Sequence, residues 1–148
     1  MGKGGMNCAG GWPVPRITGR DKVDARLAGL AGAQTVQRVG QALYAGGELI
    51  RAEAAHLITE GAVSGKNHVP SLPGEPPNED TGVLRTHIET TQVAPLRVEV
   101  SSNAPYAVPL EAGSSKMGAR PYMGPAARRK KKEVIALVRG AVNQAVKG

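Results

Sequence analysis

The sequence predicts an α+β domain: a long N-terminal helix, then an antiparallel β-hairpin or small sheet, then a C-terminal helix, joined by extended loops rich in proline and glycine. Three observations predict this class. An apolar stripe at helical spacing runs through residues 34–60, apolar and polar residues alternate over 96–100, and a second helical stripe covers 126–146. The 148 residues suit a single domain, which we place at residues 20–148.

The first part of the chain changes from an irregular segment to helices. Residues 1–19 are rich in glycine, proline and small residues without periodicity, which predicts a flexible arm. A short helix follows, with apolar residues at helical spacing: Val23, Leu27 and Leu30. The long helix is expected from about residue 34 to 60. Inside it, Gly46-Gly47 predicts a kink or a close backbone contact, and Gly61 is expected to cap its end.

A proline-rich loop separates the long helix from the predicted hairpin. Residues 62–80 contain four prolines, which exclude a regular helix, and a loop of this length is usually functional or disordered. Asp80 and Thr81 then offer side-chain caps for a short turn of helix through Leu84.

The predicted hairpin joins two runs with strand character. Residues 88–93 alternate weakly and residues 96–100 alternate cleanly, with the tight Ala94-Pro95 connection between them. Residues 105–111 fit either a strand or a short helix, and residues 112–125 read as a loop before the C-terminal helix.

The positive charge is concentrated in the last quarter of the chain. The formal net charge is +7, but residues 116–148 carry nine Lys or Arg against Glu133 alone, so the rest of the chain is close to neutral. Five of these cations are consecutive: Arg128, Arg129, Lys130, Lys131 and Lys132. We expect this basic run at the start of the C-terminal helix, where the macrodipole disfavours positive charge. It indicates either contact with phosphates or an acidic partner, or a solvated, solubilising face.

Several function classes are excluded by what the sequence lacks. The lone Cys8 cannot form an internal disulfide or a zinc site, and no apolar run approaches the roughly 18–20 residues that span a bilayer. No signal peptide is readable, so we expect synthesis in the cytoplasm. The three histidines are too far apart for a metal-binding pair, and the acids of the proline-rich loop lack a rigid scaffold. We therefore expect no enzymatic activity, no metal and no cofactor.

Four short segments in the second half of the chain resemble a known family. In chain order they are residues 72–77, residues 80–85, residues 106–107 with 111–114, and residues 119–126. In this order and spacing the chain resembles the neck and tail-completion proteins of long-tailed bacteriophages, the HK-type minor tail components, over about residues 70–148. The positions that match the family pattern are Asp80, Thr81, Gly82, Leu84, Tyr106, Ala107, Glu111, Gly113, Arg120, Pro121, Tyr122, Pro125 and Ala126.

The match departs from the family pattern at four positions. Ser114 stands for the usual Thr, Tyr122 for Phe and His87 for Ser, which roughly keeps size or polarity. Ala112 stands where an aromatic residue is usual, so one aromatic anchor is missing.

The resemblance implies a structural protein of the virion. Family members form a ring, generally hexameric, at the head–tail junction, where they join head-closure or adaptor proteins to the tail terminator and tail tube. Double-stranded DNA passes through the ring without sequence-specific contact, and assembly takes place in the host cytoplasm without a membrane. Two alternatives remain open: a tail terminator ring of the same junction, and a basic protein that binds double-stranded DNA on its own.

Overall fold

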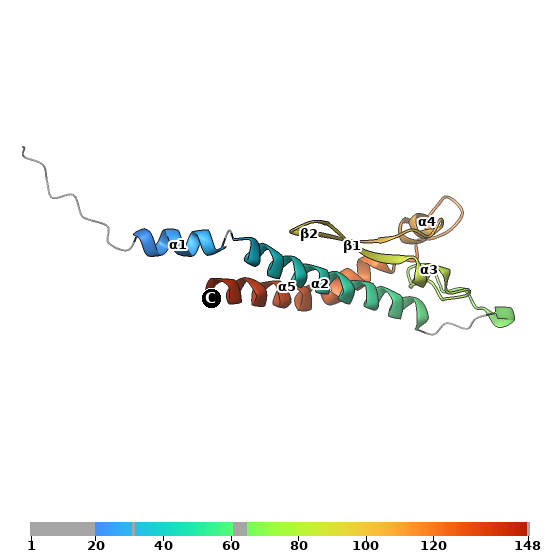
Figure 1. Ribbon diagram of the computed structural model, residues 1–148. Helices are drawn as coiled ribbons and strands as arrows, with labels where there is room; N and C mark the ends of the chain where they lie inside the picture. The colour runs from blue at the N-terminus through green and yellow to red at the C-terminus, as the bar shows by residue number, and fades with distance from the viewer. Residues whose placement is uncertain (1–19, 31, 61–64, 148) are drawn as a thin grey trace, which may run out of the picture.

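The computed structural model describes residues 20–30, 32–60 and 65–147, and it confirms the α+β class (Figure 1). The elements in chain order are α1 Arg20–Leu30, α2 Ala33–Thr59, the 3-10 turn η1 Gly65–Asn67, α3 Val83–Thr86, β1 Ile88–Ala94, β2 Arg97–Ser102, α4 Ala107–Ala112 and α5 Met123–Lys147. The predicted arm at residues 1–19 and the predicted cap Gly61 lie outside the described residues. Of the two possibilities for residues 105–111, the helix is the correct one.

Helix α2 is the centre of the fold, because α5 packs along one side of it and the hairpin along another (Figure 1). Two adjacent glycines make both approaches close. A Cβ at Gly46 would lie 2.8 Å from Cγ1 of Val134 on α5, and one at Gly47 would lie 2.7 Å from Cγ2 of Thr90 on β1. The Gly46-Gly47 pair therefore marks close contacts on two faces of a continuous helix.

The sheet consists of the two antiparallel strands predicted from the alternation. The register pairs Ile88 with Ser102 and Thr90 with Val100, and it shifts near the turn, between Gln92 and Ala94. One face of the hairpin packs on α2, and the other face carries polar residues exposed to solvent.

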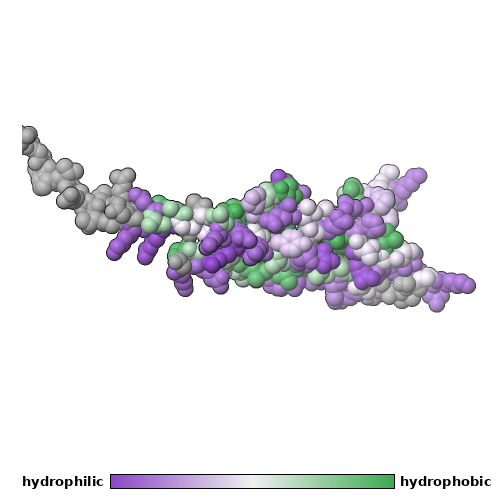
Figure 2. Space-filling model, in the orientation of Figure 1, coloured by the Kyte–Doolittle hydropathy of each residue, from purple (hydrophilic) through white to green (hydrophobic). Residues whose placement is uncertain are grey.

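The buried core lies at one end of the elongated molecule, where the C-terminal end of α2 meets α3, α4 and the start of α5 (Figure 1). Its members are Ala54, Leu57, Ile58, Leu84, Ile88, Ala104, Ala107, Leu110, Tyr122 and Ala126. Toward the other end the molecule is less covered. Figure 2 shows apolar patches between the hydrophilic side chains of one face, and Ile135, Leu137 and Val142 of α5 are at least 40% exposed.

Candidate functional site

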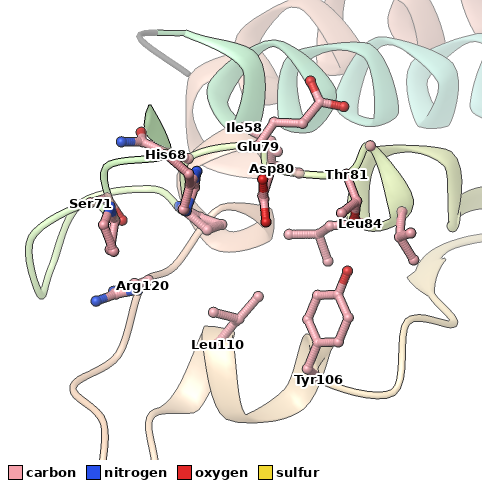
Figure 3. Close-up of a pocket in the computed structure, with 15 residues that line it drawn as sticks. Ile58, His68, Ser71, Glu79, Asp80, Thr81, Leu84, Tyr106, Leu110 and Arg120 are labelled. Carbon is pink, nitrogen blue, oxygen red and sulfur yellow. The ribbon is translucent and has the colours of Figure 1, made fainter. Parts of the chain in front are cut away.

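All four segments that carry the family resemblance have residues at the core end of the molecule. Six matched positions line one cavity of about 340 Å³ between the proline-rich segment, α3 and α4: Asp80, Thr81, Gly82, Leu84, Tyr106 and Arg120. In Figure 3, Leu110 and Tyr106 point into this space from α4 and its N-terminal flank, and Leu84 and Asp80 face them from the other side. Residues up to 40 positions apart in the sequence thus form one structural unit.

Glu111 holds the start of α5. Its carboxylate accepts hydrogen bonds from the backbone N–H groups of Tyr122 (2.9 Å), Met123 (3.1 Å) and Gly124 (2.9 Å). The first N–H groups of a helix have no partner within the helix, and Pro125 has no N–H at all. One side chain from α4 therefore satisfies the free donors of the first turn, and its negative charge complements the macrodipole.

Tyr122 and Ala126 anchor the same helix end in the core. Tyr122 is 1% exposed and Ala126 is fully buried, against Leu84 of α3 and Ala107 of α4 in the same cluster. Burial raises the pKa of the Tyr122 hydroxyl above its ordinary value, because the phenolate would lose its hydration there. These matched positions fix where α5 starts.

Two matched glycines occupy backbone conformations that other residues rarely adopt. Gly82 precedes α3 with φ at 75°, and Gly113 follows α4 with φ at 81°. A Cβ at Gly113 would also lie 3.0 Å from the backbone nitrogen of Ala119. Glycine is the residue that reaches these turns without strain, which explains both positions locally.

The predicted side-chain caps of α3 are wrong. Gly82 is the N-cap residue of that helix and no side chain caps it. The Asp80 carboxylate instead accepts a hydrogen bond from the N–H of Gly65 at 3.3 Å, and Thr81 is exposed. The left-handed turn at Gly82 separates both residues from the helix they were expected to cap.

Arg120 joins the cavity wall to α4. Its backbone N–H donates to the carbonyl oxygen of Leu110 at 2.6 Å, and Pro121 then leads into α5. Among the described residues, Arg120 Nε and the hydroxyl of Ser71 are buried without a hydrogen-bond partner. Figure 3 shows both side chains on the same side of the cavity. No feature of the sequence around Ser71 predicts that this residue lies at the cavity.

The structure divides the basic run into paired and unpaired cations. Arg129 donates to Glu53 of α2 at 3.1 Å, and Lys130 lies 3.9 Å from the same carboxylate and 2.9 Å from Glu133. The other three residues are exposed and have no ion-pair partner in the described part of the chain: Arg128, Lys131 and Lys132. Glu53 is a residue that sequence reasoning missed, since its partners lie more than 70 positions away.

The expected position of the basic run at the helix start is wrong. Helix α5 begins at Met123, three residues before the predicted Ala126, so the run occupies the second and third turns. The macrodipole acts within the first turn, and it therefore disfavours these charges less than the sequence suggested. The hydrogen bond to Glu133 raises the pKa of Lys130 above its ordinary value.

Histidine, aspartate or glutamate side chains occur in each of the described ranges, residues 20–30, 32–60 and 65–147. No group of three His, Cys, Asp or Glu side chains in these ranges is placed to hold a metal ion. His56 lies on α2 near Glu60 and His87 ends α3, while His68 lines the cavity. No helix in the same ranges is long and apolar enough to cross a membrane.

No protein-family model, curated protein or solved structure matches the chain.

Proposed function

We propose that this chain is a structural, non-enzymatic virion protein that forms a ring at the head–tail junction of a long-tailed bacteriophage. The observation that carries the proposal is the ordered series of segments resembling the neck family, whose matched residues surround one helix junction. Its partners are other copies of the chain, the head-closure or adaptor proteins, and the tail terminator or tail tube. DNA passes through the central channel.

The shape of the molecule supports a role as a connector. A ring arises when one surface of each copy binds a different surface of the next and the rotation closes. The chain is elongated, and α1 extends away from the core end along the direction of α2 (Figure 1). At the opposite end, the proline-rich segment exposes Val69 and Leu72, which are 62% and 66% exposed. Elements at both ends can thus reach neighbouring subunits.

Particle assembly without the protein tests the proposal. Phage carrying an early stop codon in this gene should produce full heads and separate tails that fail to join, visible by negative-stain electron microscopy. Supplying the wild-type chain in trans should restore joined particles. Infectious virions of normal appearance without the chain would overturn the assignment.

The unpaired cations of the basic run favour a second candidate, a protein that binds double-stranded DNA on its own. Exposed cations release counterions when they neutralise phosphates, so affinity falls steeply with salt. The variant R128Q/K131Q/K132Q removes the three unpaired charges, and R129Q/K130Q is the matched control that removes the two charges bound to Glu53.

Two measurements on these variants separate the candidates. If the free protein binds DNA through the unpaired cations, the triple variant lowers the slope of log affinity against log salt by about 2.7, and the control lowers it less. If the chain works in the neck, the free protein binds DNA weakly with a shallow slope. The triple variant then tests whether the three cations contact DNA in the channel of assembled particles. Unchanged joining of heads to tails and unchanged DNA retention would mean that they do not.

A further inference from the structure

Within the described part of the chain, the hydrogen-bonding groups on the two outer edges of the hairpin are unused. The sheet has two strands in the described chain, and Figure 1 shows no other strand beside them. A hairpin of this size is marginally stable without further partners, and a free edge is a template for pairing. The hairpin is already supported by α2 on one face, so its edges remain for another strand.

One backbone hydrogen bond identifies the groups that point outward. The N–H of Asn103 donates to the carbonyl oxygen of His87 at 2.9 Å, so these residues form a hydrogen-bonded pair. Such pairs alternate along an antiparallel ladder. With the observed register, the next hydrogen-bonded pair is Glu89 with Ser101, and every second pair toward the turn is also hydrogen-bonded. The residues between them direct their N–H and C=O groups away from the partner strand.

The outward groups of β2 form one of the two edges. They belong to Val98, Val100 and Ser102, and no backbone or side-chain hydrogen bond within the described residues uses them. On β1 the outward groups belong to Thr90 and Gln92 and are likewise unused, while Ile88 is buried at the start of the strand. Neither stretch contains a proline or lysine, the residues that commonly block an edge.

We propose that the β2 edge of one copy pairs antiparallel with the β1 edge of the next copy, so that the ring is held by a continuous sheet. This inference rests on the proposed ring. The two edges lie on opposite sides of one hairpin. When copies related by rotation are added one after another, each strand of the extended sheet therefore runs antiparallel to its neighbours. Each added copy also brings its own α2, which covers the same face of the extended sheet. The contact is heterologous, as a closed ring requires.

The charges on the exposed face of the hairpin are compatible with this pairing. When Thr90 of one copy lies opposite Val100 of the next, Glu89 faces Ser101. No like charges then meet across the interface, since the residue after Thr90 is an uncharged threonine. A slip of two residues toward the hairpin turn would place Glu89 opposite Glu99, which is unfavourable. Charge therefore favours one register over this neighbouring one.

Disulfide trapping between two single-cysteine chains tests the pairing. Both chains carry C8S; one carries E89C and the other carries S101C together with an affinity tag. In the proposed register these positions form a non-hydrogen-bonded pair, whose Cα atoms lie roughly 4.5 Å apart and within disulfide range. Because each chain holds one cysteine, any E89C–S101C product joins two copies. The exposed L72C variant mixed with E89C is the control and should give little product.

Hydrogen exchange on the full wild-type chain gives a second readout. The outward amides of Val98, Val100 and Ser102 should exchange at least about tenfold more slowly in the assembled protein than in the dilute monomer. The inward amides of Glu99 and Ser101 should be protected in both states and serve as the internal reference.

The outcomes separate the edge pairing from the ring itself. Rings that form without the E89C–S101C product, and with unprotected outward amides, overturn the edge pairing and leave the ring standing. A chain that stays monomeric at every concentration and is absent from virions overturns both. Trapping between two copies of S101C alone at similar yield would indicate a two-fold dimer and would also contradict the proposal.

Discussion

Replacing Glu111 with Ala should loosen the start of α5, because three backbone N–H groups would lose their acceptor at once. The loss of a helix cap costs about 1–2 kcal/mol, and the loss of a partly buried charge at a helix N-terminus adds about 1 kcal/mol. We therefore expect the free energy of unfolding to fall by about 2–3 kcal/mol. For a chain of this length that corresponds to a drop in Tm of roughly 6–10 °C, measured by circular dichroism at 222 nm.

Two further variants test whether the destabilisation comes from the lost cap and not simply from the loss of a glutamate. E111Q keeps the shape and one acceptor oxygen, and should lose about half as much stability as E111A. E133A removes a glutamate whose side chain is 54% exposed and paired with Lys130, and should change the unfolding free energy by about 0.5 kcal/mol or less. The cap assignment would be refuted if E111A unfolded within about 0.5 kcal/mol of the wild type.

Two other predictions follow from burial. G46A should lower the free energy of unfolding in urea by about 1 kcal/mol, because its Cβ would lie 2.8 Å from Val134. G140A should raise it by about 0.5–1 kcal/mol, because a Cβ there meets no described atom within 4 Å. Equal effects of the two substitutions would contradict the packing. The raised pKa of folded Tyr122 means that its contribution to stability is present below the unfolded pKa of about 10 and is lost as pH rises above it. Y122F should flatten this alkaline loss in unfolding free energy, and a Y122F profile as steep as the wild type would contradict the burial effect.

The elements that the sequence predicted best are those with a long local pattern. Helix α2 carries its apolar stripe over seven turns, so its ends were predicted within one residue of Ala33 and Thr59. The hairpin follows from alternation and a proline turn, both local features. Helix α4 stayed ambiguous because it is short and has no side-chain cap, and its Pro109 lies in the first turn, where a helix tolerates proline.

The contacts that build the core end were beyond a local pattern. The resemblance drew attention to Glu111, but its role as the cap of α5 depends on N–H groups eleven to thirteen positions away. The Asp-Thr-Gly segment suggested a side-chain cap for α3, whereas the positive φ of Gly82 turns the backbone and leaves Asp80 bound to Gly65. In both places the backbone path decides which groups meet.

The basic run shows how a helix changes the meaning of a charge pattern. In the sequence its five cations are equivalent, and together they would give a salt slope of about 4.5 if all contacted phosphates. At 3.6 residues per turn they lie on different faces, and Glu53 on α2 pairs with Arg129 and Lys130. Three cations remain for an anion, which lowers the expected slope to about 2.7. A measured slope that falls by about 4.5 when all five cations are replaced would mean that Glu53 releases both partners on binding.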